Sequence, residues 1–166
     1  MTFDSIPASA AIFVDTNTLV YHFASHPQFG SACTRLLERI ERLEISGYTS
    51  AHVVHEMAHR LMTIEACSRM GWPTRGIAQR LRRHPGQVQH LTRYKQAIDE
   101  LGLFNLRFLP TTSPLVSLAA DVSQQTGLLS GDALIVSTMR DQGLTHLASL
   151  DRDFDRVPSI TRYAPT

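Results

Sequence analysis

Short apolar runs alternate with helical patterns along this chain, and no other feature constrains its fold as strongly. The run AAIFVD at 10–15 is apolar and contains branched side chains, which predicts a strand. Further strands are expected at 47–49, 106–110, 146–150 and 159–163. Helices are expected at 17–25, 31–45, 51–66, 87–101, 113–126 and from 130 onward. Strands that alternate with helices predict an α/β fold with a mainly parallel sheet.

Several of the expected helices carry signals for their ends and for their packing. Ser50 is suited to cap the helix over 51–66, and Pro114 suits the first turn of the helix over 113–126. Glu38 and Arg42 stand four residues apart, which predicts an ion pair on an exposed helix face. Apolar residues at helical spacing are expected to face the core: Cys33, Leu36, Leu37, Ile40, Leu43, Val53, Val54, Met57, Leu61 and Ile64.

The composition indicates an ordinary soluble domain. With 166 residues, 43% of them hydrophobic, the chain is most simply one domain with a core of its own. The net charge of +1 does not by itself mark a nucleic-acid binder, so the positions of the charges must decide. Cys33 and Cys67 are expected to be unpaired, buried thiols. Because neither a signal peptide nor an apolar run of about 18 residues is evident, we expect a soluble, cytoplasmic protein.

Three aspartates stand where a parallel sheet would bring them together. Asp15 follows the first expected strand directly, Asp151 follows a later one, and Asp132 lies in the first turn of an expected helix. Each alone is also compatible with a plainer role as a helix cap, an acid at a helix N-terminus or a turn residue. Because ligands bind beyond the carboxyl ends of parallel strands, we expect the three carboxylates to converge on one rim.

Converging carboxylates repel one another unless a divalent cation neutralises them. Oxygen ligands suit hard ions such as Mg²⁺ or Mn²⁺, which retain part of their water shell and bind phosphate groups. A site of this kind activates water and stabilises the charge that develops when a phosphodiester is hydrolysed. The aspartates therefore predict metal-dependent phosphate chemistry.

Four segments resemble, in order, the motifs of the PIN-domain family. They are FVDTNTLV (13–20), VVHEMAHRL (53–61), GDALIVSTM (131–139) and LASLDRDFDRVPSI (147–160). Each is weak alone, but four in family order, from roughly residue 11 to 163, are specific. The chain is similar to the VapC-type toxin ribonucleases of bacterial toxin–antitoxin pairs. The resemblance implies a three-layer α/β/α fold, with the sheet flanked by helices, formed by a single domain over 1–166.

The resemblance also implies a site and its chemistry. The catalytic, metal-binding acids would be Asp15, Glu56, Asp132 and Asp151. The polar neighbours that orient ligands or waters would be Asn17, Ser149 and Asp153, and Asp153 stays open as an alternative to Asp151 for the fourth acid. The implied activity is a ribonuclease that depends on Mg²⁺ or Mn²⁺, and the implied partners are a small antitoxin and a second copy of the chain. Whether the protein is a toxin or a housekeeping nuclease stays open, as does its RNA target.

The segment 66–98 departs from the short toxins. It holds seven basic residues and no Asp or Glu: Arg69, Arg75, Arg80, Arg82, Arg83, Arg93 and Lys95. We expect a basic helical insertion here. It is either a solvated face or an arm that binds RNA phosphates, with Arg80, Arg82 and Arg83 as the candidate contacts.

Three other functions compete with the nuclease. His55, Glu56 and His59 form an H-E-x-x-H pattern, the signature of zinc metalloproteases. The nuclease interpretation instead needs only Glu56 to face the acidic cleft, while the two histidines could face elsewhere on the helix. A phosphatase of the haloacid-dehalogenase class would use Asp15 as its nucleophile, but Asn17 stands where that class needs a second Asp. A PIN module that binds nucleic acid without catalysis is the third alternative.

Overall fold

The computed structural model describes residues 1–166 and contains one five-stranded sheet. Its strands are β1 (Ala11–Val14), β2 (Ser46–Ser50), β3 (Arg107–Leu109), β4 (His146–Ala148) and β5 (Thr161–Tyr163). They lie in the order β3-β2-β1-β4-β5, and each neighbouring pair is parallel. This confirms the predicted parallel sheet and places β1 at its centre, where both neighbours cover it.

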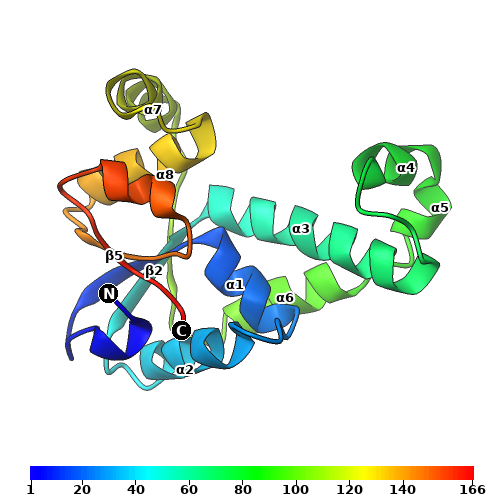
Figure 1. The fold of residues 1–166 in the computed structure, drawn as a ribbon, viewed down its shortest axis with the longest axis horizontal. Helices are drawn as coiled ribbons and strands as arrows, with labels where there is room; N and C mark the ends of the chain where they lie inside the picture. The colour runs from blue at the N-terminus through cyan, green and yellow to red at the C-terminus, as the bar shows by residue number, and fades with distance from the viewer.

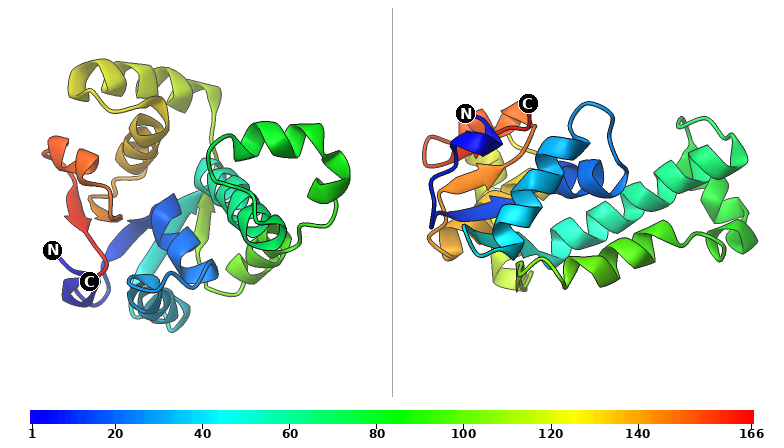
Figure 2. Two further views of the ribbon diagram at one scale, coloured as in Figure 1. Left: turned by 45° about the vertical axis from the view of Figure 1, so that its right-hand side comes forward. Right: turned by 90° about the horizontal axis from the view of Figure 1, so that it is seen from below.

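Helices cover both faces of the sheet (Figure 1). On one side lie α1 (Thr16–Phe23), α2 (Gly30–Glu41), α3 (Ala51–Met70) and α6 (Arg93–Leu101), with α3 packed against α1 and α6. On the other side α7 (Ser113–Thr126) packs along α8 (Ser130–Asp141), as Figure 2 also shows. Two short 3-10 helices, η1 (Phe3–Ser5) and η2 (Arg152–Arg156), complete the fold. The three layers confirm the predicted α/β/α arrangement.

The main core lies between the sheet and these helices. Its largest fully buried side chains include Ile12, Phe13, Leu19, Leu36, Leu37, Ile40, Met57 and Leu61. Gly47 on β2 marks the closest approach of backbone to this core, since a Cβ there would lie 2.6 Å from the Ile40 side chain and 2.8 Å from Leu106. Only a glycine lets β2 and α2 pack at this distance.

The helix ends differ from the prediction in two places. Helix α2 ends at Glu41 rather than at 45, and Leu43 has a positive φ of 59° and is 73% exposed. Ile64, expected in the core, is exposed because the segment after α3, together with α6, covers the face of α3 that carries Glu65 and Ala66. The cap at Ser50 is confirmed, since its side chain accepts a hydrogen bond from the Val53 backbone N–H at 3.4 Å.

Helix α3 continues past its predicted end at 66 and projects from the body of the molecule (Figures 1 and 2). It ends at Met70, where Gly71 adopts the left-handed conformation with a φ of 62°. Helices α4 (Ile77–Arg83) and α5 (Pro85–Val88) follow at the far end, and α6 returns along α3. The helix predicted over 87–101 is therefore wrong as a single element, because a turn separates α5 from α6. We call residues 66–98 the arm.

The arm has a small core of its own, in which Ala66, Ile77, Leu81 and Leu91 are buried together. Beside it, the Glu65 side chain is only 3% exposed. Its carboxylate accepts hydrogen bonds from the backbone N–H groups of Thr92 at 3.0 Å and Arg93 at 2.9 Å, and from the Arg69 guanidinium at 3.1 Å. A buried carboxylate thus joins α3 to the first residues of α6.

Three smaller expectations can be compared with the structure. Cys33 and Cys67 are free thiols, as predicted, and Cys33 is buried, whereas the predicted burial of Cys67 is wrong because it is only partly buried. Arg42 and Glu38 form the expected exposed ion pair at 3.7 Å. None of the helices combines the length and the apolar character that a membrane span requires.

Candidate active site

Asp15 lies at the carboxyl end of the central strand, between β1 and α1. It is 5% exposed, and its Oδ1 atom accepts a hydrogen bond from the Thr16 backbone N–H at 2.6 Å. An extended aspartate at this position caps the helix that follows, which is why the chain turns from strand to helix here. Asp15 therefore caps α1 and also lies at the edge of the sheet, where the sequence predicted it.

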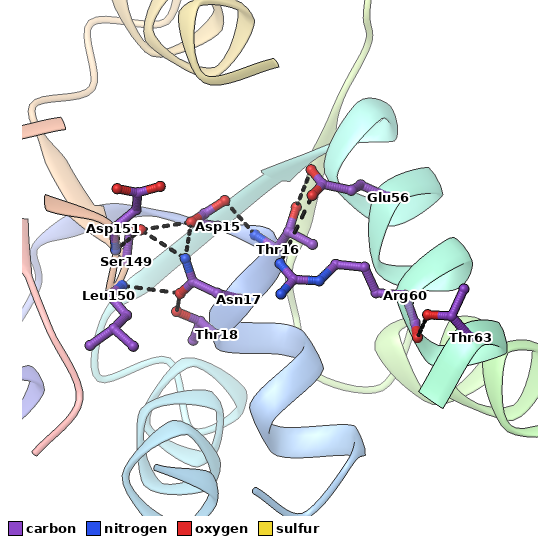
Figure 3. Close-up of polar contacts among 10 residues, drawn as sticks. All are labelled: Asp15, Thr16, Asn17, Thr18, Glu56, Arg60, Thr63, Ser149, Leu150 and Asp151. Atoms are coloured by element: carbon purple, nitrogen blue, oxygen red, sulfur yellow. Dashed lines mark hydrogen bonds and ion pairs between the residues drawn. The ribbon is translucent and has the colours of Figure 1, made fainter. Parts of the chain in front are cut away.

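Asn17 and Ser149 hold the other carboxylate oxygen of Asp15, as Figure 3 shows. Asn17 Nδ2 donates to Asp15 Oδ2 at 2.5 Å, and Ser149 Oγ donates to the same oxygen at 2.6 Å. Asn17 Oδ1 accepts from the Leu150 backbone N–H at 3.0 Å. These contacts tie the end of β1 to the segment after β4, and they fix the rotamer of Asp15.

Glu56 reaches the site from the first half of α3. Its Oε2 atom accepts a hydrogen bond from the Thr16 hydroxyl at 3.0 Å, so the residue that anchors Glu56 directly follows Asp15 in the chain. The Arg60 guanidinium lies 3.9 Å from Glu56 Oε1, one helical turn further along α3. Figure 3 shows the Glu56 carboxylate directed toward Thr16, and the site is therefore built across β1, α1 and α3.

Asp132 and Asp151 approach the same rim from the other layer of the fold. Asp132 lies in the first turn of α8, and Asp151 caps η2 by accepting the Asp153 backbone N–H at 2.8 Å. The pKa of Asp132 is raised to about 6, first by burial and then by the negative charges of Asp151 and Glu56. The structure thus brings the carboxylates of all four predicted acids into one electrostatic neighbourhood.

The pKa of Asp15 is also raised, to about 7, and burial is the largest cause. The hydrogen bonds from Ser149 and Thr16 oppose this rise, while the charges of Glu56 and Asp132 add to it. A buried carboxylate with acidic neighbours is costly to ionise unless a cation lies close by. The charge distribution at this rim therefore favours a bound cation.

The aspartates next to Asp151 have cationic partners of their own. Asp153 forms an ion pair with Arg156 at 2.9 Å, and Asp155 accepts two hydrogen bonds from Arg162 at 2.8 and 2.9 Å. These hydrogen bonds hold the pKa of Asp155 below its usual range. Of the three carboxylates in this segment, Asp151 is the one without an ion pair, which favours it over Asp153 as the fourth acid.

The donor set fits a hard divalent ion, although the spacing is open. No three side chains of the Asp, Glu, His or Cys type lie close enough to enclose a metal ion between them. Mg²⁺ keeps several waters and typically takes only one or two protein carboxylates together with substrate phosphate. Carboxylate oxygens on an open rim suit that mode of binding better than they suit an ion that needs a closed cage.

The histidines of the H-E-x-x-H pattern do not face away from the acids, as the sequence had suggested they could. A hollow of about 450 Å³ is bordered by His52, His55, Glu56, His59, Gly131 and Asp132. His55 and Glu56 are rotated from one another around α3, but the first turn of α8 borders the same hollow as both of them. The expectation that the histidines lie elsewhere is therefore wrong.

Sequence reasoning missed two cations and one hydroxyl at the site. Arg60 and Arg152 border a separate, smaller hollow, of about 290 Å³, together with Asn17 and Asp151. Thr16 holds Glu56, as described above. Thr16 stands beside Asp15 in the sequence, Arg152 stands beside Asp151, and Arg60 stands one helical turn after Glu56, so the neighbouring acids could have pointed to all three.

The family model described as PIN domain matches residues 12–160 of this chain. The chain belongs to the PIN-domain family. The match spans the four segments that suggested the family, from β1 to the residue before β5. It also favours the PIN interpretation of Glu56 over the zinc-protease interpretation of the same helix.

This PIN domain has a curated relative in Methanocaldococcus jannaschii, named ribonuclease VapC6. The two are 31% identical over 67 residues, which is 40% of this chain and 44% of the relative. The chain thus matches less than half the length of that protein.

Solved structures share the fold of this PIN domain. VapC20 of Mycobacterium tuberculosis, described as a toxin that cleaves the sarcin-ricin loop, has a TM-score of 0.62 at 18% identity, covering 89% of this chain and 95% of that one. VapBC2 of Rickettsia felis, bound to a promoter DNA fragment, has a TM-score of 0.61 at 16% identity, covering 94% and 99%. At these identities the likeness concerns the fold.

Proposed function

We propose that this PIN domain is a metal-dependent endoribonuclease and the toxin of a toxin–antitoxin pair. One observation carries the proposal: the buried Asp15 carboxylate lies at the end of the central strand, linked through Thr16 to Glu56 and facing the charge of Asp132. The names of the relatives in Methanocaldococcus jannaschii and Mycobacterium tuberculosis support a ribonuclease. Asp15, Glu56, Asp132 and Asp151 are its proposed catalytic acids.

The same four carboxylates would hold Mg²⁺ or Mn²⁺, directly or through water. When bound, such an ion supplies a Lewis acid, a water of lowered pKa and a partner for the developing charge on phosphate. The residues around it have separate tasks. Asn17 and Ser149 keep Asp15 in one orientation, and Thr16 does the same for Glu56.

Arg60 and Arg152 would bind the RNA backbone beside the acids. Both border the hollow that contains Asp151, and guanidinium groups hydrogen-bond phosphate oxygens in two places at once. Their positive charge offsets the repulsion between the acidic rim and the incoming phosphodiester. Hydrolysis then breaks the bond between phosphorus and the leaving ribose oxygen, while a water oxygen takes its place.

The partners follow from the same proposal. VapBC2 of Rickettsia felis is a complex, and its name supports a small protein partner for this chain as well. We also propose a homodimer, one domain over residues 1–166, and the arm as a basic insertion that binds RNA through Arg80, Arg82 and Arg83. All three arginines are exposed on α4, as phosphate contacts require.

The test is cleavage of single-stranded or looped RNA by the purified protein. Mg²⁺ or Mn²⁺ should support cleavage and excess EDTA should stop it. Asp15→Asn should reduce the rate at least about 100-fold, because it removes a ligand charge at almost constant volume. Arg140→Ala, a change on the far part of α8, is the matched control. Full activity of Asp15→Asn, or unchanged cleavage in EDTA, would contradict the proposal.

A further inference from the structure

Three histidines form a row along α3 that the proposed chemistry does not use. His52, His55 and His59 are three and four residues apart, so they share one face of the helix. All three border the hollow that contains Glu56 and Asp132. The row therefore begins at the acidic rim and leads away from it along α3.

The inner end of the row lies against the start of α8. His52 Nε2 is buried without a hydrogen-bond partner, and it would lie 3.3 Å from a Cβ at Gly131. Because Gly131 has no side chain, the imidazole can approach the turn that delivers Asp132. The first histidine of the row is thus in contact with the segment that carries a proposed catalytic acid.

The outer end of the row opens into a second hollow, of about 560 Å³, between α3, α4 and α5. His59 borders both hollows and therefore joins them. The second hollow has an apolar floor and a polar edge: Met62, Leu81, Val88, Arg82 and Gln89. From His52 to Met62 the helix rises about 15 Å, at about 1.5 Å per residue.

We infer that this continuous surface, which we call the histidine track, binds the unpaired RNA strand on one side of the scissile phosphate. The inference rests on the proposed ribonuclease function and extends it to the substrate. Histidine rings can stack on nucleobases, the aliphatic floor can pack against them, and Arg82 can bind a phosphate. Gln89 is placed at the edge where a base can be hydrogen-bonded.

Charge favours RNA over a protein segment as the occupant. Apart from Glu56 and Asp132 at its inner end, the track has no acidic lining residue. The arm that forms its outer wall also contains no Asp or Glu over residues 66–98. A wall of this kind attracts a polyanion along its whole length, while the acids stay confined to the reacting end.

Binding is measured with Asp15→Asn protein, so that the RNA stays intact, and with a fluorescent, unstructured RNA of about a dozen nucleotides. His59→Ala and Arg82→Ala should each weaken binding about tenfold, the effect of losing one stacking or phosphate contact. The salt slope should fall by about one for Arg82→Ala and stay constant for His59→Ala. His90→Ala and Arg140→Ala, whose side chains border neither hollow, are matched controls.

A second measurement locates the RNA directly. An oligonucleotide with a photoreactive base should cross-link to a peptide of α4 or α5, and Val88→Asp should remove that cross-link. In the wild-type background, His59→Ala and Arg82→Ala should raise KM and leave kcat nearly constant. Unchanged binding, KM and cross-linking would overturn the track, whether the hollows hold only solvent or receive a protein segment. Absence of cleavage by the wild type would contradict the proposed function alone, because binding is scored in protein that cannot cut.

Discussion

The Thr16 hydroxyl donates a hydrogen bond to Glu56 Oε2 over 3.0 Å, between residues 40 positions apart. Thr16 also donates its backbone N–H to Asp15. One residue at the junction of β1 and α1 therefore holds two proposed catalytic acids, Asp15 at the end of β1 and Glu56 on α3. The distance between those carboxylates depends on it.

Replacing Thr16 by Val should release Glu56 from its position beside Asp15 and lower the RNA cleavage rate without disturbing the fold. The methyl group keeps the volume but cannot donate, so Glu56 loses its anchor. We expect about a tenfold fall in the RNA cleavage rate, as for other residues that orient metal ligands, and a similar fall in Mg²⁺ affinity. Thr16→Ser should restore both. Equal rates for the Val and Ser variants would show that the hydroxyl has no such role.

Ionisation of the buried Asp15 carboxyl should make the metal-free protein less stable as pH rises. Its pKa is about 7 in the fold, above the ordinary value of 3.8. A carboxyl whose pKa is raised by folding contributes stability below its unfolded pKa and loses it as pH rises through the folded pKa. Asp132, raised to about 6, acts in the same direction. In EDTA, the melting temperature of the wild type should therefore fall between pH 4 and 7 relative to Asp15→Asn.

Added Mg²⁺ should reverse that difference. The ion binds the ionised carboxylates, so its stabilising effect should be small at low pH and grow as pH rises through 6 to 7. Thermal melts with and without Mg²⁺ across this range check the prediction. A Mg²⁺ effect that is independent of pH, or equal in Asp15→Asn, would contradict it.

Glu65→Ala should loosen the arm and leave the main core intact. The change leaves the backbone N–H groups of Thr92 and Arg93 and the Arg69 guanidinium without their buried acceptor. Removing one partner of a buried charged network costs about 3–5 kcal/mol. Hydrogen exchange should therefore become faster in α4, α5 and the start of α6, but not in β1. Glu38→Ala, which removes an exposed ion pair with Arg42, should change little.

Gly47→Ala should destabilise the main core by about 1–3 kcal/mol, as overpacking does. Its Cβ would lie 2.6 Å from the Ile40 side chain and 2.8 Å from Leu106, so α2 or the residue before β3 must move. Gly86→Ala is the matched control, because nothing lies within 4 Å of the Cβ there. Urea unfolding of the two variants should separate them clearly, and equal midpoints would contradict the packing argument.

The sheet and the acids at its edge could be predicted because their signals are local. A buried strand needs an apolar run, and an aspartate that ends the strand and caps the next helix stands immediately after it, as Asp15 does. The contacts of Asn17 with Asp15 and Ser149 follow the same logic, since each residue adjoins the end of a strand. Parallel pairing then brings these ends together.

The arm could not be predicted in the same way. Ile64 is exposed while Glu65 and Ala66 are buried, because the arm and α6 cover one face of the outer part of α3, and the spacing of apolar residues does not record which face that is. The partner of Glu65 is the start of α6, 27 residues away, so its burial has no local signal. The histidines had a recognisable pattern, but their neighbours on α8 come from a distant part of the chain.

Helix α3 is continuous over Ala51–Met70, a length of about 30 Å. Glu56 lies near its base, beside Asp15, while Glu65 and the small core of the arm lie near its tip. No proline or glycine interrupts the helix, and it packs against α1 and α6. Helix α3 is therefore one continuous element that connects the acidic site with the arm. We therefore expect that a molecule bound to the arm, if it changes the direction of α3, also shifts the Glu56 carboxylate relative to the sheet.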